Sequence, residues 1–268
     1  VILRNVLEVR PRLARAWREL GLTLVSHGNV REGIDSLRRA LSLAPDDART
    51  VGGLARGLFI GSAEFKEAAA CFERAVERSP EAGWYWMQLA HCCGLLREFK
   101  RGEKAARRAI ALQEAFLSGQ QGIQLVGAYM RLGHLLALQN RAEEAHNAFA
   151  SEVAFIDKID HALRTRIRIE LHMRVGASLL ALGNKSRAEA EFTTGLDAFA
   201  RRLALGADEP FTRYYAAAIH ALRGENDEAL DHLEKAVAGS PAFMVARARI
   251  EPEWNGLRSS ERFARLIA

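Results

Sequence analysis

The sequence repeats a set of small and aromatic residues every 34 or 35 positions. Pro11, Pro45 and Pro80 recur at this interval, and Ala40 and Ala75 each stand five residues before a proline. A unit of this length cannot bury its apolar face alone, so successive units must stack on one another. The period therefore predicts a stack of helix pairs with a concave face, which favours a binding function.

Each unit combines small and bulky residues in a fixed order. In the first complete unit Trp17, Leu20 and Gly21 precede Ala40 and Pro45. Small residues let two helices approach closely, bulky residues fill the remaining space, and proline ends the second helix. This pattern resembles the tetratricopeptide repeat, a helix-turn-helix unit of about 34 residues. The resemblance implies an all-α, right-handed superhelical α-solenoid.

We expect six units, preceded by part of a unit and followed by a closing segment. The predicted ranges are 1–13 for the second helix of an incomplete repeat, then 14–47, 48–82, 83–116, 117–160, 161–205 and 206–243 for repeats 1 to 6, and 244–268 for a C-terminal capping segment. Repeats 4 and 5 are expected to be longer, with extra turns around residues 116–124 and 156–165.

The tail does not follow the repeat pattern. It resembles the closing segment found after the last repeat in bacterial tetratricopeptide arrays of regulators and signalling enzymes. An end unit must cover the exposed apolar face of the array, and we expect Trp254, Leu257, Phe263 and Leu266 to do so.

The resemblance also implies a partner-binding groove, because the first helix of each repeat lines the concave face in this family. The candidate groove residues are Arg15, Arg18, Arg49, Arg56, Trp84, Met87, His91, Met130, His134, Met173 and Tyr214. Three methionines share one equivalent position, and flexible Met side chains suit a surface that accepts an apolar peptide or helix. The alternative is that longer helices turn this methionine row into the core.

The arginines among the groove candidates lie toward the N-terminal end. Together with the methionines they predict a basic entrance and an apolar middle, which suits a peptide carrying carboxylates at one end and large hydrophobic residues beyond. The Lys and Asn residues of a chaperone-tail clamp are missing from these rows. Recognition of a chaperone tail is therefore disfavoured.

A second candidate surface is a basic stripe on the predicted outer side of repeat 3. It consists of Arg97, Lys100, Arg101, Lys104, Arg107 and Arg108, which recur at steps of three and four residues. One interpretation is an ordinary solvated face, partly neutralised by Glu103. The other is a docking patch for an acidic partner or a phosphate backbone.

The sequence lacks the patterns of known catalytic and cofactor sites. Adjacent side chains on a helix point about 100° apart, so His91, Cys92 and Cys93 are not expected to converge on a metal. Together with Cys71 these cysteines form an odd set without framework spacing, which favours a reducing compartment. No phosphate loop, zinc-protease helix or serine elbow is present. We expect no enzymatic activity, no metal and no cofactor.

Charge and hydropathy restrict the partners further. The net charge of +5 is modest for 268 residues, and base-reading side chains do not recur at a fixed place, so nucleic acid is an unlikely partner by sequence. No apolar run approaches the roughly 20 residues of a membrane span, and no secretory signal is visible, which favours the cytoplasm. The chain starts with Val1 inside a partial repeat, which indicates a piece of something longer.

Two functions fit this pattern. The first is a scaffold or adaptor that binds a peptide or helix of a partner protein in the concave groove. The second is a sensory or regulatory C-terminal domain of a larger signalling enzyme or transcriptional regulator. The identity of the partner and the oligomeric state are not encoded in a readable way.

Overall fold

The computed structural model describes residues 2–117, 125–159 and 164–268, and the described residues are helical without any strand. The α-helices are α1 (Ile2–Val9), α2 (Ala14–Ser26), α3 (Val30–Leu43), α4 (Ala48–Arg56), α5 (Phe65–Arg78), α6 (Gly83–Leu95), α7 (Phe99–Leu117), α8 (Ala128–Ala137), α9 (Ala142–Ile156), α10 (Arg164–Ala181), α11 (Lys185–Ala204), α12 (Pro210–Arg223), α13 (Asn226–Gly239), α14 (Pro241–Ile250) and α15 (Glu261–Leu266). Two short turns of other helical types, η1 (Gly57–Gly61) and η2 (Pro252–Leu257), complete the chain.

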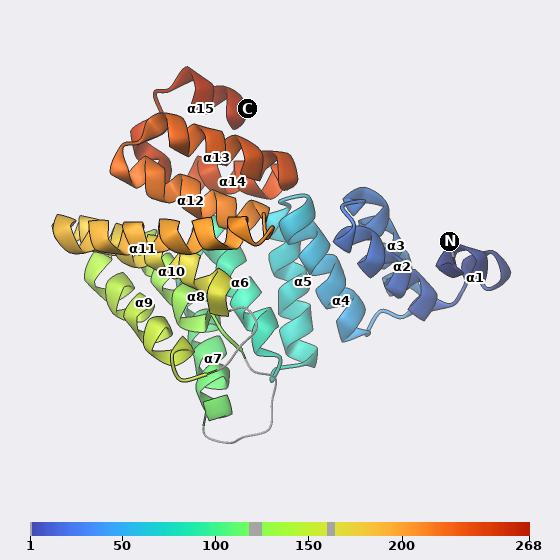
Figure 1. Ribbon diagram of the computed structural model, residues 1–268. Coiled ribbons are helices and arrows are strands. Elements are labelled where there is room, and N and C mark those ends of the chain that lie inside the picture. The colour runs from blue at the N-terminus through green and yellow to red at the C-terminus, as the bar shows by residue number, and fades with distance from the viewer. Residues whose placement is uncertain (1, 118–124, 160–163) are drawn as a thin grey trace.

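The helices pack as consecutive antiparallel pairs, α2 with α3 through α12 with α13 (Figure 1). The repeat boundaries stay a prediction; α7 ends at Leu117, one residue past the end predicted for repeat 3. The predicted all-α solenoid is confirmed. The extra turns expected around residues 116–124 and 156–165 lie largely outside the described residues. Among the described helices, none has the length and apolar character needed to cross a bilayer.

A hydrogen bond links the opening tryptophan of a repeat to the proline that closes the preceding one. The indole Nε1 of Trp17 donates to the carbonyl oxygen of Pro11 at 2.9 Å, and Trp86 donates to Pro80 in the same way at 2.8 Å. Proline cannot continue the helical hydrogen-bond ladder, and its carbonyl lies in the turn between two repeats, where it can accept from the indole. The contact sets the angle at which the next helix begins.

Glycine allows the two helices of a repeat to touch. A Cβ on Gly133 of α8 would lie 2.5 Å from Cε1 of Phe149, and one on Gly176 of α10 would lie 2.3 Å from Cε1 of Phe192. Both phenylalanines are buried. In these two repeats an aromatic ring on the second helix therefore packs against the backbone of the first, as small-residue packing predicts.

Repeat 2 contains one residue more than repeat 1, and the end of its first helix accommodates it. There the α-helical turn widens into the π-helical turn η1, followed by Ala63 with a φ of +56°. A π-helical turn is the usual way in which a helix absorbs one inserted residue. The turn places Leu58 and Phe59 in the core.

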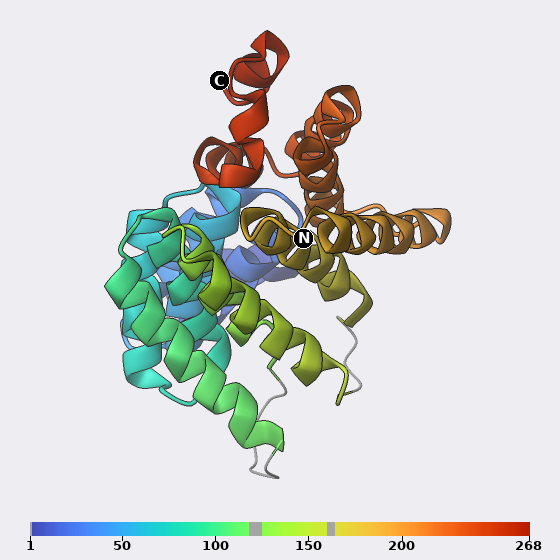
Figure 2. The same ribbon diagram turned by 90° about the vertical axis from the view of Figure 1, so that its left-hand side faces the viewer.

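The C-terminal segment closes the array and also reaches back to repeat 2. Trp254, Leu257 and Phe263 are buried, and η2 packs on α12 while α14 and α15 pack on α13. Leu266 is half-buried against the core. In addition α14 contacts η1, so that the C-terminal helices lie over the α4–η1 end of repeat 2 (Figure 2).

Candidate partner-binding face

The predicted groove residues separate into an exposed group and a buried group. The exposed group lies on the first helices of repeats 1 to 3, and the buried group lies mostly on α6, α8, α10 and α12. The exposed residues are Arg15, Arg49, Arg56 and Trp84, which we call the basic strip. The buried residues are Met87, His91, Met130, His134, Met173 and Tyr214. Arg18 falls between the two groups, since its side chain is 12% exposed.

The guanidinium groups of Arg15, Arg49 and Arg56 make no ion pair with any other described residue. Arg18, by contrast, donates to Asp47 at 2.7 Å and to Glu19 at 2.8 Å. The pKa of Arg18 is raised, mainly by the hydrogen bond with Asp47. Three charges of the basic entrance are therefore free, and the fourth is already neutralised.

Trp84 provides an aromatic surface beside these charges. Its side chain is 37% exposed and packs edge to face on Phe72 and Tyr85, with ring centroids 5.9 and 5.6 Å away. Burial raises the pKa of the Tyr85 hydroxyl, and the nearby charge of Arg49 partly offsets this rise. The Tyr85 ring packs on Gly52 of α4, the helix that also carries Arg49, so the aromatic pair lies next to this helix.

The methionine row is not exposed. The exposed fractions are 8% for Met87, 2% for Met130 and 0% for Met173. The row therefore packs in the interior, as the alternative interpretation of the sequence predicts. The reason differs along the row. Met87 packs with Ala109, Leu125 and Ala128 in a cluster of its own, whereas Met130 and Met173 belong to the main core. On α10 and α12 the C-terminal segment fills the inner side, where Glu253 and Glu251 contact Arg174 and Tyr214.

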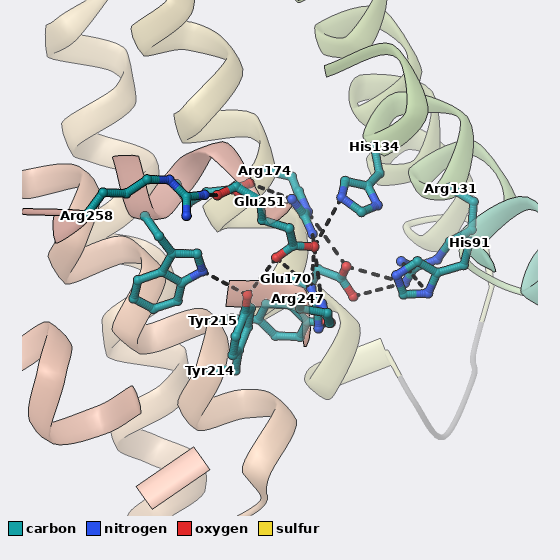
Figure 3. Close-up of polar contacts among 12 residues, drawn as sticks. His91, Arg131, His134, Glu170, Arg174, Tyr214, Tyr215, Arg247, Glu251 and Arg258 are labelled. Carbon is teal, nitrogen blue, oxygen red and sulfur yellow. Dashed lines mark hydrogen bonds and ion pairs between the residues drawn. The ribbon is translucent and has the colours of Figure 1, made fainter. Parts of the chain in front are cut away.

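These side chains meet in a buried group that we call the inner cluster (Figure 3). It consists of His91, Arg131, His134, Glu170, Arg174, Tyr214, Tyr215, Arg247, Glu251, Glu253 and Trp254. Four successive first helices, α6, α8, α10 and α12, contribute one or two residues each, and the C-terminal segment contributes the rest.

Glu251 is the centre of the inner cluster. Its carboxylate accepts hydrogen bonds from Nη2 of Arg174 at 3.1 Å, from Nη2 of Arg247 at 3.0 Å and from the hydroxyl of Tyr214 at 2.8 Å. The indole of Trp254 donates to the same Tyr214 hydroxyl at 2.8 Å. Arg247 also lies over the Tyr214 ring, with its guanidinium carbon 4.4 Å from the ring centroid.

Two further ion pairs complete the cluster, Arg174 with Glu253 and Arg131 with Glu170. Nη1 of Arg174 donates to Oε1 of Glu253 at 2.5 Å. Nη2 of Arg131 donates to Glu170 at 3.2 Å, and its Nη1 donates to Nδ1 of His91 at 3.5 Å. Three guanidinium groups thus share the interior with three carboxylates, as buried charges must be paired to be tolerated.

The protonation states follow from burial and from these pairs. Burial alone would raise the pKa of Glu251, but the charges of Arg247 and Arg174 hold it well below its usual range. Burial raises the pKa of Glu253, and Arg174 offsets this only in part. Burial and the charge of Arg174 lower the pKa of His134 to about 4, although Glu251 lies 3.1 Å away. At neutral pH His134 is therefore uncharged, and its contact with Glu251 is not an ion pair.

His91, His134 and Glu251 bring three potential metal ligands within 4.8 Å of one another. The surrounding charges do not fit a cation, because Arg131, Arg174 and Arg247 all border the same space. Glu251 is moreover already satisfied by two guanidinium groups and a hydroxyl. The group fits a neutral polar core better than a metal centre. Cys92 and Cys93 are buried, free and not part of it.

Sequence reasoning missed the charged members of the inner cluster. Arg131 and Arg174 directly follow Met130 and Met173, so they occupy one equivalent position of repeats 4 and 5. Two arginines at the same inward position, and two glutamates two residues apart in the tail, were the available signal. Their pairing was not readable because nearly 80 residues separate the partners.

Glu152 forms a separate buried site. It stands where the repeat pattern expects a small packing residue, and its carboxylate accepts from the amides of Gly127 at 2.7 Å and Tyr129 at 2.9 Å. Gln113 donates to the same carboxylate at 3.2 Å. A carboxylate at this place satisfies the free amides at the start of α8 and the positive end of the helix dipole. Its role is structural.

The outer basic stripe lies on α7 and the turn before it. Arg97, Lys100, Lys104, Arg107 and Arg108 are exposed, and Arg107 is 3.7 Å from Glu103. Arg101 is half-buried and pairs with Glu73 at 2.5 Å and with Glu98. Only part of the stripe therefore carries unpaired charge, and a docking function for it stays a prediction.

Known structures share the fold of this chain at low sequence identity. A family model of the tetratricopeptide repeat matches residues 2–48. None of the curated proteins matches the sequence. The structure of a tetratricopeptide repeat protein from Parabacteroides merdae is 13% identical with a TM-score of 0.64, over 99% of this chain and 88% of that one.

Two further structures support the same fold. A chain of the APC/C hetero-tetramer Cut9-Hcn1 is 15% identical with a TM-score of 0.60; the match covers this whole chain but only 45% of that one. PilW, a widely conserved type IV pilus biogenesis factor, is 18% identical with a TM-score of 0.58, over 72% of this chain and 80% of that one. Residues 2–48 therefore match the tetratricopeptide repeat, and the whole described chain has the α-solenoid fold of these structures.

Proposed function

We propose that this chain is a protein-interaction scaffold that binds a segment of a partner protein along its basic strip. The single observation that carries the proposal is that Arg15, Arg49 and Arg56 are exposed and unpaired beside Trp84 on successive first helices. Repeat arrays use this face for extended binding surfaces. The C-terminal part of the face is filled by the chain itself, which leaves the strip as the accessible part.

The chemistry of the strip selects the kind of segment. Guanidinium groups recognise carboxylates through two parallel hydrogen bonds, which gives both affinity and orientation. An exposed tryptophan supported by other rings is a frequent anchor for a large hydrophobic side chain. The segment that fits is acidic over several residues and carries one large hydrophobic residue next to them.

Three features argue that the free arginines serve binding. Arg18 on α2 is, by contrast, paired with Asp47 and Glu19. Leaving three charges unpaired on adjacent helices gives a local positive field that attracts an acidic partner. Gly52 also lets the Tyr85 ring lie on α4, since a Cβ there would be 2.4 Å from Cε1 of Tyr85. This close packing keeps the aromatic surface rigid.

The test uses a peptide array in which the number of acidic residues and of large hydrophobic residues varies independently. The wild-type chain should retain peptides that combine both, and retention should fall steeply with added salt. A triple Arg15→Glu, Arg49→Glu, Arg56→Glu variant should lose this retention by about a hundredfold, which is about 3 kcal/mol of binding free energy.

The matched control carries the same change of charge elsewhere. A Lys100→Glu, Lys104→Glu, Arg108→Glu variant alters three exposed cations of the outer stripe on α7. Its retention of the acidic peptides should equal that of the wild type. If the control loses retention and the strip variant keeps it, the outer stripe is the binding surface and the proposal is wrong. Trp84→Ala should remove the preference for hydrophobic residues while leaving that for acidic ones.

A further inference from the structure

The concave face between α6 and α12 holds a segment of the chain's own C-terminal region, residues 241–257, which we call the inner segment. It comprises α14 and η2. We propose that this part of the face is a second binding surface, specific for a segment with the pattern Arg-x3-Glu-x-Glu-Trp, and that the inner segment occupies it in this structure. The proposal concerns a different surface from the basic strip and does not depend on it.

The array side of this surface consists of groups placed to receive that pattern. Arg174 of α10 contacts both glutamates, Glu251 at 3.1 Å and Glu253 at 2.5 Å. Tyr214 of α12 donates to Glu251 and accepts from the indole of Trp254, each at 2.8 Å. One arginine and one tyrosine thus read both glutamates and the tryptophan of the pattern.

The arginine of the pattern is recognised in a different way. Arg247 lies over the ring of Tyr214 at 4.4 Å and donates to the hydroxyl of Tyr215 at 3.5 Å. It also holds Glu251 within the inner segment itself. The pair enters the interior as a preformed unit, which lowers the cost of burying either charge alone.

Charge complementarity favours a specific occupant. The array contributes Arg131, Arg174 and Glu170 to the interior, which leaves one positive charge in excess. The inner segment contributes Arg247, Glu251 and Glu253, which leaves one negative charge in excess. Without an occupant Arg174 would face only Glu170, whose Oε1 is 3.7 Å from its Nε. The vacant surface would therefore attract a segment of the same pattern.

One contact of the inner segment is not needed for closing the end of the array. The Phe243 ring lies 4.9 Å from Phe59 of η1 and 5.9 Å from His91 of α6, in repeats 2 and 3. An end cap has to cover only the last repeat. This contact ties the start of the inner segment to the opposite part of the array. The ring also borders Arg247 at 5.5 Å and Phe211 of α12 at 5.7 Å, but Phe243 itself supplies no hydrogen-bonding side chain, so replacing it loosens the segment while keeping every hydrogen-bonding group of the inner cluster.

A segment supplied by another molecule must compete with a tethered one. Tethering gives the inner segment an effective concentration in the millimolar range, so the wild-type chain should exclude a free competitor at micromolar concentration. Weakening the Phe243 contact should lower the effective occupancy and admit the competitor. The consequence is a surface that opens to a partner only when the chain's own segment is released.

The experiment measures binding of a fluorescent synthetic peptide of residues 241–257 to the full chain by anisotropy. Wild type should show no binding in the micromolar range, and Phe243→Ala should bind at least about tenfold more tightly than wild type. The same peptide carrying Glu251→Gln and Glu253→Gln should bind the Phe243→Ala chain at least about tenfold more weakly than the unchanged peptide does. This second comparison uses the same folded chain, so it does not depend on the stability of the variant.

Phe149→Ala is the matched control, because Phe149 is equally buried on α9 and packs on Gly133 rather than on the inner segment. It should exclude the peptide as the wild type does. Binding to Phe149→Ala as tight as to Phe243→Ala would mean that any loss of stability admits the peptide, and would overturn the proposal. Equal binding of the two peptides by Phe243→Ala would overturn it as well.

Two further readouts keep the outcome decisive. If Phe243→Ala loses its helical circular dichroism, Phe243→Leu replaces it, with the same expected order of affinities and a smaller difference. A concentration-dependent dimer of the Phe243 variant, seen by light scattering after gel filtration, would show that the surface takes the same segment from a second copy and supports the proposal. Absence of peptide binding by a folded Phe243 variant contradicts it.

Discussion

Arg174 on α10 and Glu251 at the start of η2 are 77 positions apart in the sequence, yet Nη2 of the arginine donates to Oε1 of the glutamate at 3.1 Å. Both side chains are 1% exposed. This pair connects repeat 5 to the C-terminal segment in the interior of the superhelix. It explains why the face that the repeat pattern assigns to binding is filled over its C-terminal part.

Replacing Glu251 should destabilise the whole array. In Glu251→Gln two buried guanidinium groups, those of Arg174 and Arg247, lose their shared anion, and breaking a buried ion pair from one side costs about 3–5 kcal/mol. Urea unfolding followed by circular dichroism measures the loss. Arg262→Ala, which removes exposed pairs with Asp231 and Glu234, should unfold near the wild-type midpoint. Equal midpoints for all three proteins would contradict the prediction.

Stability should decrease as the pH falls below about 6.5. His134 is buried with a pKa of about 4, while in the unfolded chain its pKa is close to the usual histidine value of 6.5. Between these values the unfolded chain takes up a proton that the native chain does not, so stabilisation present above pH 6.5 is lost toward pH 4, by about 3 kcal/mol for this residue. Burial lowers the pKa of His91 as well, which adds to the loss.

The contribution of His134 can be isolated by comparing slopes. In His134→Gln the free energy of unfolding should vary less between pH 6.5 and pH 4.5 than in the wild type, whatever the absolute stability of the variant. The groups that face this side chain are Glu251, Arg174, Arg131 and His91. Glu251 does not titrate in this window, since the charges of Arg247 and Arg174 hold its pKa well below its usual range. Parallel pH profiles would refute the assignment.

Adding a methyl group at the glycine of a helix pair should force the pair apart. Gly133→Ala and Gly176→Ala would each place a Cβ less than 3 Å from a buried phenylalanine ring, and overpacking of this kind costs about 1–3 kcal/mol. The control is Gly256→Ala, where nothing lies within 4 Å of the added atom and φ is not positive. Thermal unfolding should rank the two repeat glycines well below the control.

Glu152 should be essential for the start of α8. Glu152→Ala leaves the buried amides of Gly127 and Tyr129 without their acceptor, at a cost of about 3 kcal/mol. Hydrogen exchange of these two amides should accelerate more than that of the middle of α8. Glu143→Ala, on the exposed side of the same helix α9, should leave both readouts unchanged. Slow exchange at both amides in Glu152→Ala would mean that another group replaces the carboxylate.

The repeat architecture could be predicted because it depends on short-range patterns. Gly133 and Phe149, or Trp86 and Pro80, meet within one repeat or across one boundary, so the 34-residue period reports their contact directly. The basic strip followed from the same frame, which placed Arg15, Arg49 and Trp84 at one equivalent position. Whether Met130 and Met173 are exposed or buried could not be predicted. The repeat pattern indicates which side of a helix faces inward, but it does not indicate which residues pack against that side.

The sequence alone determined that the chain folds into paired helices that stack into a solenoid with a concave face, since this depends on neighbours within about 35 residues. Only the tertiary structure decided whether that face is open. The answer depends on the small rotation added at each repeat and on contacts such as Phe59 with Phe243 and Arg174 with Glu251. Such contacts join distant segments through the summed curvature of the array, which no single residue encodes.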